Sequence, residues 1–422
     1  MSDEFNEIHE GPDRKLRKLP LIFILITLLV DAIGFGLIIP VMPVLLKELL
    51  GQTSEEAAKW GGYLTFAYAA MHFLFGPLIG NLSDRFGRRP VLLLSLASLA
   101  VDYIIMGFAS TIWVLFVGRI LSGICGATSS TANAYIADMT DQENRAQAFG
   151  LLGAAFGIGF ILGPAIGGLL GASNPRTPFF VAAALAFLNM LYGYLVLPES
   201  LSVENRRRFE LSRGNPLGAL THFKKLPALK LLFVVSLFSS FAHLVYPSTW
   251  NFHADARYGW GAEQIGWSLM AFGICSAIVQ GGLIGLVLKW LGQQKTAIVG
   301  MVFNILGFIG FAFASQSWMI YLWIPVSALG AVAGPSINAL MSEKVGPDSQ
   351  GELQGAIASV SAIANMFSPL IMTQVFSWFL REEASTKFYG SAFLLAAILT
   401  GIATTLLIVG FRTQQAAQKK PG

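Results

Sequence analysis

Long apolar stretches alternate with short polar ones along the chain. Most of these stretches reach about 20 residues, the length that an α-helix needs to cross the hydrocarbon core of a bilayer. We therefore predict an all-α membrane protein with twelve transmembrane helices. The expected spans cover residues 20–45, 61–83, 90–109, 111–137, 145–171, 178–197, 229–250, 261–288, 295–314, 317–342, 351–379 and 388–411.

The longest polar interruption, Pro198 to Lys230, divides these spans into two sets of six. The two sets resemble each other, because a shift of 205 residues places Gly80 on Gly285, Gly87 on Gly292, Gly150 on Gly355 and Pro164 on Pro369. Two related halves around a central site are typical of secondary transporters. We expect a cytoplasmic tail at 1–19, pseudo-symmetric six-helix bundles at 20–197 and 229–411, a cytoplasmic linker at 198–228 and a second cytoplasmic tail at 412–422.

Composition supports a membrane location. Only 12% of the 422 residues are charged and 54% are hydrophobic, whereas soluble proteins carry about a quarter charged residues. Lys and Arg concentrate in the tails, the linker and alternate loops, which places both termini in the cytoplasm. The net charge of +4 is no reason to invoke nucleic acid. The two cysteines, Cys125 and Cys275, lie in apolar segments and suggest neither a disulfide nor a metal site. We expect no cofactor, a lipid bilayer around the chain, and a monomer.

Ionisable side chains inside the expected spans are few. Asp31, Asp102 and Arg119 lie in spans 1, 3 and 4, and His72 and His243 in spans 2 and 7. A charge in the bilayer costs several kcal/mol, so it usually marks a functional group or a paired partner. Carboxyl and imidazole groups can bind and release protons. Structural roles remain open: a helix cap for Asp31, a satisfied interior acid for Asp102, an Arg119 ion pair with either acid, and packing for the histidines.

Two further segments stand out. The loop between spans 2 and 3 combines glycines, one acid and three arginines, and we expect it to gate the cytoplasmic side together with an acid at the end of span 4. Its residues are Gly80, Asp84, Arg85, Gly87, Arg88 and Arg89, with Asp138 as the further acid.

Span 5 is rich in small residues that favour close helix packing, and it holds a proline that can kink the helix. Its candidate hinge or packing residues are Gly157, Gly163, Pro164, Gly167 and Gly168.

These motifs together resemble a known family. The loop G-x-L-x-D-R-x-G-R-R, the run Asp31-x-x-Gly-x-Gly-Leu-Ile-x-Pro-x-x-Pro, the Gly118-Arg119 segment and the Gly157–Gly168 helix are similar to the twelve-helix drug:proton antiporters of the major facilitator superfamily, and most of all to the tetracycline–proton antiporters. The resemblance implies a bacterial inner-membrane protein that exports a small amphipathic compound, such as a tetracycline-like drug, in exchange for protons. It also implies that Asp31, Asp102 and Arg119 serve transport and that the Asp84 loop gates it.

Two positions depart from the tetracycline antiporters. Asn304 stands where that family has an acid in span 9, and His72 stands in place of a glutamine. Because an imidazole takes up protons near neutral pH, we expect His72 to contribute to proton coupling. We also expect Asp31, His72 and Arg119, together with the neutral groups of Asn133, Gln280 and Asn304, to contact substrate. Asn338 and Asn365 are further candidates for neutral hydrogen-bonding contacts in the cavity.

Other functions remain open at this point. A metabolite or siderophore exporter and an uptake symporter have the same fold, and a receptor or scaffold that no longer transports is a further alternative. An enzyme is not expected, because the sequence shows no nucleophile–base pairing, phosphate loop or metal cluster.

Overall fold

The computed structural model describes residues 12–126, 128–140, 145–209, 226, 229–346, 349–382, 384 and 387–418. Apart from short 3-10 and π segments, the secondary structure of this part is α-helical. The first half holds α1 (Pro12–Ile38), α2 (Met42–Leu50), α3 (Ser54–Phe86), α4 (Arg88–Gly107), α5 (Ile112–Cys125), α6 (Thr128–Met139), α7 (Arg145–Ser173) and α8 (Thr177–Val196). The second half holds α10 (Lys230–His243), α11 (Val245–Tyr258), α12 (Ala262–Ile278), α13 (Ile284–Phe313), α14 (Ser317–Ala328), α15 (Ala333–Ser342), α16 (Gln350–Leu380) and α17 (Ser391–Gln418).

Within the described residues, 11 helical stretches are long and apolar enough to cross a membrane. One of them, Ala262–Phe313, has 52 residues, which is enough for two crossings at about 20 residues each. Its backbone leaves the helical conformation at Gly292, where φ is 72°. The stretch therefore contains both the eighth and the ninth expected spans, and the twelve-helix prediction is confirmed.

Gly292 also reveals the internal repeat. Gly87, its counterpart in the first half, separates α3 from α4 with a φ of 106°. Only glycine adopts positive φ readily, so both turns require it. The related prolines lie inside long helices as well, Pro164 in α7 and Pro369 in α16.

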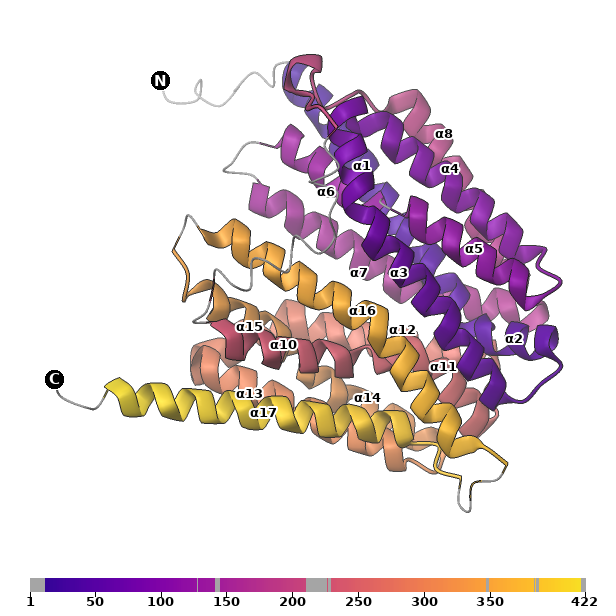
Figure 1. Cartoon of the computed structure of the whole chain (residues 1–422), viewed down its shortest axis with the longest axis vertical. Coiled ribbons are helices and arrows are strands. Elements are labelled where there is room, and N and C mark those ends of the chain that lie inside the picture. Colours follow the sequence, from indigo (N-terminus) through magenta and orange to yellow (C-terminus); the bar gives the residue numbers. More distant parts are fainter. Residues whose placement is uncertain are drawn as a thin grey trace, which may run out of the picture.

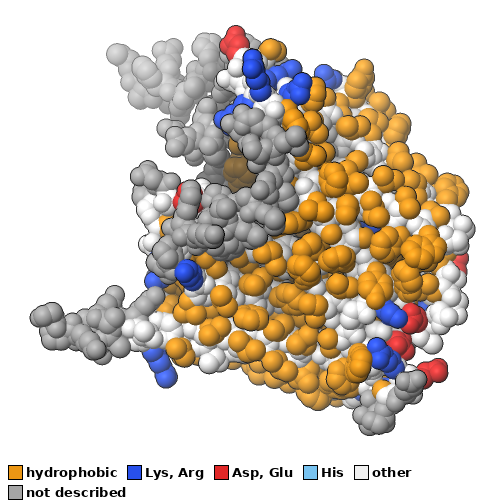
Figure 2. Space-filling view, in the orientation of Figure 1, with side chains coloured by type: hydrophobic (Ala, Val, Ile, Leu, Met, Phe, Trp, Pro, Cys, Tyr) orange, Lys and Arg blue, Asp and Glu red, His pale blue; other side chains and the backbone are white. Residues whose placement is uncertain are grey.

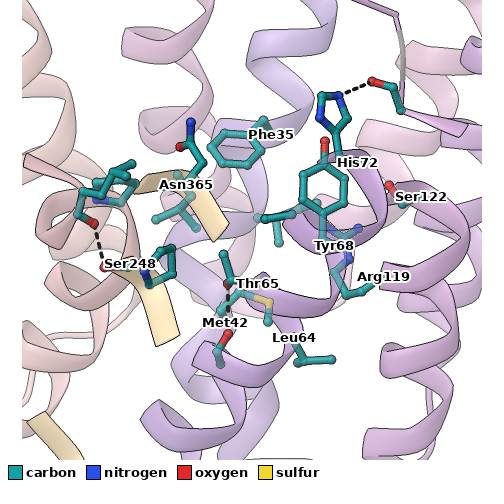
Figure 3. A pocket seen from close by; sticks show the side chains of 18 of the residues that line it. Phe35, Met42, Leu64, Thr65, Tyr68, His72, Arg119, Ser122, Ser248 and Asn365 are labelled. Carbon is teal, nitrogen blue, oxygen red and sulfur yellow. Dashed lines mark hydrogen bonds between the residues drawn. The ribbon is translucent and has the colours of Figure 1, made fainter. Parts of the chain in front are cut away.

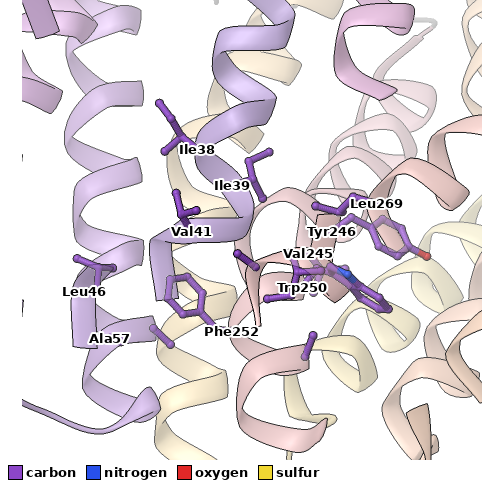
Figure 4. Close-up of a cluster of buried hydrophobic side chains, with 14 of the residues drawn as sticks. Ile38, Ile39, Val41, Leu46, Ala57, Val245, Tyr246, Trp250, Phe252 and Leu269 are labelled. Carbon is purple, nitrogen blue, oxygen red and sulfur yellow. The ribbon is translucent and has the colours of Figure 1, made fainter. Parts of the chain in front are cut away.

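The two halves pack against each other through two helix pairs, α7 with α12 and α3 with α16. Figure 1 shows the two sets of helices converging near α2 and α11 and diverging toward the end where α1 begins and α17 finishes. At the converging end one apolar core is shared by both halves. Figure 4 shows it, with Ile39 and Val41 of the first half beside Val245 and Trp250 of the second.

The outer surface is apolar over a broad band. Figure 2 shows hydrophobic side chains covering the middle of the visible face, with charged side chains toward its edges. Large exposed members include Trp113, Leu195 and Trp290, which are 65%, 73% and 79% exposed. A soluble protein rarely exposes so much apolar surface, so this chain is a multi-pass membrane protein.

Candidate functional site

A cavity of ≈ 660 Å³ lies between the two halves. Its volume is within the usual range for sites that bind drug-sized molecules. Helices α1, α3, α4 and α5 contribute one wall, and α11 and α16 contribute the facing wall. The polar lining residues are Asp31, Thr65, Tyr68, His72, Tyr103, Arg119 and Ser122 from the first half and Ser248, Asn251, Ser361 and Asn365 from the second.

Asp31 is the acid that lines this cavity. It lies on α1, between apolar residues that place this helix in the bilayer, and its side chain is half-buried. Within the described part of the chain, its carboxyl group has no ion pair. A half-buried carboxyl without a charged partner is free to exchange a proton or to meet a cation. The structure therefore places this predicted residue on the wall of the cavity.

Arg119 pairs with the other intramembrane acid. Its Nη2 atom lies 2.5 Å from Oδ2 of Asp102, whose side chain is 1% exposed. The guanidinium also lies over the ring of Tyr68, 5.5 Å from its centroid. Of the two ion pairs that the sequence left open, the structure shows the one with Asp102. Asp102 is thus shielded from the cavity, while the arginine and tyrosine form part of its wall.

His72 occupies the same wall, one helical turn from Tyr68. Its Nε2 atom lies 3.0 Å from the carbonyl oxygen of Gly126, and its ring stacks on Tyr68 with centroids 5.9 Å apart. Figure 3 shows both rings at the edge of the cavity, near Arg119. His243, by contrast, is not among the lining residues; its ring packs edge-on against Tyr246.

The arginine loop is held together by contacts of Arg88. Its guanidinium binds Asp84 at 2.5 Å and Asp138 at 3.0 Å, so the structure joins three of the five charged residues that the sequence singled out. Arg85 lies over the ring of Phe86 instead. Gly80 has open space where a Cβ would point. In this conformation, these contacts lie within the first half.

Glu199, which caps the start of α4 next to this loop, was not predicted from the sequence. Both carboxylate oxygens of Glu199 accept backbone hydrogen bonds, from the N–H of Arg88 at 2.8 Å and of Arg89 at 3.3 Å. Arg89 in turn donates to the carbonyl oxygen of Tyr194. A carboxylate satisfies the free N–H groups at a helix start and complements the helix dipole. Its sequence signal was weak, because Glu199 lies among other polar residues after α8.

A family model described as Major Facilitator Superfamily matches residues 24–369. The chain belongs to the major facilitator superfamily. Among its relatives, the class C tetracycline resistance protein of Escherichia coli is 40% identical over 379 residues, covering 90% of this chain and 94% of the relative. The class G protein of Vibrio anguillarum is 37% identical, covering 91% and 95%. Multidrug resistance protein 1 of Bacillus subtilis is 29% identical, covering 92% and 96%.

Solved structures agree on the fold. The human organic anion transporter MFSD10 superposes with a TM-score of 0.67 at 22% identity, covering 93% of this chain and 99% of that one. A bacterial homologue of the human lysosomal transporter Spinster, in an inward-facing conformation, gives 0.73 at 16% identity, covering 96% and 99%. As a member of this superfamily the protein carries a small molecule across a membrane and is not an enzyme.

In this superfamily member, the glycines in the later part of α7 serve close packing. Cβ atoms at Gly163 and Gly167 would collide with the backbone of α1, at Ile33 and Leu37, and one at Gly168 would collide with α12. Pro164 lies between them, inside the helix. Gly157, nearer the diverging end, has open space around its Cβ position. Whether α7 also works as a hinge stays a prediction.

Three of the expected substrate contacts lie outside the cavity lining in this conformation. The amide of Asn304 donates to the carbonyl oxygen of Gly330 at 3.2 Å, within the second half. Asn133 and Gln280 are exposed but do not line the cavity, and the same holds for the further candidate Asn338. Asn365, by contrast, lines the cavity as expected. The expectation for Asn304 rested on its place in span 9, and that place does not determine which face of α13 points into the cavity. For the residues outside the lining, contact with substrate therefore stays a prediction.

Other lining residues were missed in the sequence. Tyr68, Tyr103 and Thr65 are uncharged, so the rule that intramembrane charge marks function passes over them. Ser248 and Asn251 come from α11, which carries no acid before Asp255. A helical-wheel view of α3 would have found Thr65, Tyr68 and His72, which lie three and four residues apart and so share one face.

Proposed function

We propose that this protein is a proton-driven antiporter that exports a small amphipathic compound, a tetracycline-like drug or another drug, by alternating access. The observation that carries the proposal is the position of Asp31, an acid without a charged partner among the described residues, on the wall of a cavity between the two halves. The relatives named as tetracycline and multidrug resistance proteins support drug export. We place the protein in the bacterial inner membrane, as a monomer with both termini in the cytoplasm.

In this proposal the carboxyl group of Asp31 binds a proton and the substrate in turn. When the cavity faces the side with more protons, the carboxyl takes up a proton and loses its charge; when substrate enters from the other side, the proton leaves. A site that binds either a proton or a cationic group couples the two fluxes, because each excludes the other. Asp102 and Arg119 keep the neighbouring wall electrically balanced, and His72 adds a second group that can bind a proton.

Contacts between the halves support alternating access. At the converging end Lys47 binds Asp255 with an Nζ–Oδ1 distance of 2.6 Å, and Ser54 binds the other oxygen of that carboxylate at 2.7 Å. The amide of Asn251 donates to the carbonyl oxygen of Ile39 at 2.8 Å. These bonds close one mouth of the cavity, and Asp255 and Asn251 both come from α11.

At the diverging end, α7 and α12 lie apart. A Cβ atom on Gly266 would collide with Pro164 and Gly168 of α7, yet one on Gly153 of α7 or on Gly281 after α12 would meet no atom within 4 Å. A rocking motion that opens the first end would bring the second together. The arginine loop lies at this second end, where we expect it to latch the closed state.

A drug-susceptibility panel tests this function. The chain is expressed in a host that lacks its own efflux pumps, and tetracyclines, cationic dyes and other amphipathic drugs are compared. Resistance to at least one compound, abolished by Asp31→Asn at equal membrane expression, is expected. Unchanged susceptibility to every compound, with the protein present in the membrane, would favour the metabolite transporters or the non-transporting receptor.

A further inference from the structure

Two hydroxyl groups on the cavity wall present only hydrogen-bond acceptors, because they have already used their hydrogens. Thr65 donates its hydroxyl to the carbonyl oxygen of Gly61 at 2.9 Å, and Ser248 donates to that of Leu244 at 2.6 Å. A hydroxyl has a single hydrogen, so each of these oxygens offers only lone pairs to a ligand. The two lie on facing walls, Thr65 on α3 and Ser248 on α11 (Figure 3).

Two further groups present acceptors as well. The Nε2 atom of His72 faces the carbonyl oxygen of Gly126, which can only accept, so Nε2 carries the hydrogen and the neutral ring shows its Nδ1 lone pair. Asn365 donates one amide hydrogen to the carbonyl oxygen of Ser361 at 2.9 Å, which leaves its carbonyl oxygen and one N–H free. Figure 3 shows His72 and Asn365 on opposite sides of the same space.

The charge of the cavity lining also favours a cationic ligand that carries hydrogen-bond donors. Asp31 has no ion-pair partner among the described residues, whereas the Arg119 charge is matched by Asp102 at 2.5 Å. The lining residues of the second half are all uncharged. Donors remain on both walls: the hydroxyls of Tyr68 and Tyr103 and the unused N–H groups of Arg119 in the first half, and one N–H of Asn365 in the second. A ligand between the walls therefore meets one unpaired negative charge and oxygen or nitrogen lone pairs on both sides.

We propose that this site selects among cations by their N–H and O–H donors, and that Thr65, Ser248 and Asn365 are specificity-determining residues. The inference rests on the proposed function, since it concerns the substrate of the same cavity. A buried polar group that finds no hydrogen-bond partner loses its hydration without compensation. Donors on the substrate find partners here. Acceptors of a substrate placed against Thr65 and Ser248 would face other acceptors.

Two dyes isolate this property. Pararosaniline and crystal violet are triarylmethane cations with the same framework, but pararosaniline carries primary amino groups and crystal violet carries dimethylamino groups without N–H. Binding of each dye to the purified protein in detergent is measured first, so that preference is read without transport. We expect pararosaniline to bind about tenfold more tightly, the effect of one or two net hydrogen bonds.

Variants separate hydrogen bonding from dye size. Thr65→Val and Ser248→Ala each remove one acceptor, and each should weaken pararosaniline binding about two- to tenfold while crystal violet changes less than about twofold. Ser336→Ala is the matched control, because Ser336 makes the same kind of bond to the carbonyl of Val332 at 2.8 Å but lies outside the cavity. It should leave both dyes unaffected.

The outcomes distinguish the inference from the function. Equal affinities for the two dyes, no binding of pararosaniline, or a preference that survives in the Thr65→Val/Ser248→Ala double variant would overturn the inference; the last result would assign the preference to size. Transport is then measured in proteoliposomes with an imposed pH gradient. Selective binding without proton-driven transport would contradict the antiporter proposal and leave the selectivity intact.

Discussion

Arg119 on α5 binds Asp102 on α4, with 2.5 Å between Nη2 and Oδ2, and the Asp102 side chain is 1% exposed. The pair lies wholly within the first half and neutralises the charge next to the cavity. Asp31, which lines the cavity itself, keeps an unpaired carboxyl within the described part of the chain. The two intramembrane acids therefore have different surroundings, and we expect different consequences when each is replaced.

Asp102→Asn should destabilise the protein, because it leaves the Arg119 charge without its partner in a largely buried position. Removing one member of a buried ion pair costs about 3 kcal/mol of unfolding free energy. The thermal unfolding midpoint in detergent measures this loss. The double variant Asp102→Asn/Arg119→Gln, which removes both charges, should recover much of it. The single variant Arg119→Gln completes the comparison. If the double variant loses as much stability as the two single variants together, the ion pair does not account for the loss in Asp102→Asn.

Glu199→Ala should loosen the start of α4. The carboxylate accepts the N–H groups of Arg88 and Arg89, and losing a helix cap costs about 1 kcal/mol. The unfolding midpoint in detergent should fall, and the fall should be smaller for Glu199→Gln, which keeps one acceptor oxygen. Glu204→Ala serves as the control, since Glu204 is exposed on a nearby 3-10 helix. An equal fall of the unfolding midpoint in Glu199→Ala and Glu204→Ala would argue against a capping role of Glu199.

A disulfide between α3 and α16 should lock the converging end. A Cβ atom at Gly62 would lie 3.1 Å from Cβ of Thr373. A disulfide spans about 3.5–4.5 Å between Cβ atoms, so a small outward shift of α3 from α16 accommodates the bond. Gly62→Cys with Thr373→Cys, in a chain whose Cys125 and Cys275 are replaced by serine, should lose transport on oxidation and regain it on reduction. The single-cysteine variants should respond to neither treatment. Full transport by the oxidised pair would exclude opening at this end.

His72→Gln tests the imidazole as a charge switch. At acid pH a protonated His72 adds a positive charge beside Tyr68 and Arg119, which opposes a cationic substrate. The wild-type protein should therefore lose substrate affinity as pH falls, and the variant should lose less of it. Glutamine can still donate to the Gly126 carbonyl, so the fold is preserved. The measurement is pararosaniline affinity across pH 5 to 8, and superimposable profiles would leave His72 as a packing residue.

Sequence patterns predicted much of this molecule and failed in identifiable places. Asp31, Asp102 and Arg119 stood out because charge is rare in a bilayer, and Gly87 and Gly292 because the 205-residue shift places one on the other. Which acid meets Arg119 depends on how α4 and α5 rotate against each other, which periodicity leaves undetermined. Asn304 faces Gly330 inside the second half rather than the cavity for the same reason. Glu199 acts through backbone N–H groups distant in sequence, and no local motif indicates such a contact.

Asp31 gives the most direct test of proton-coupled export. The protein is reconstituted in proteoliposomes, and an imposed pH gradient drives uptake of tetracycline or of the strongest compound from the susceptibility panel. We predict gradient-driven transport for the wild type and for Asp31→Glu, which keeps a carboxyl group. Asp31→Asn should reach the membrane folded and show no gradient-driven transport. Wild-type transport by Asp31→Asn would contradict the account, because the amide cannot carry the proton.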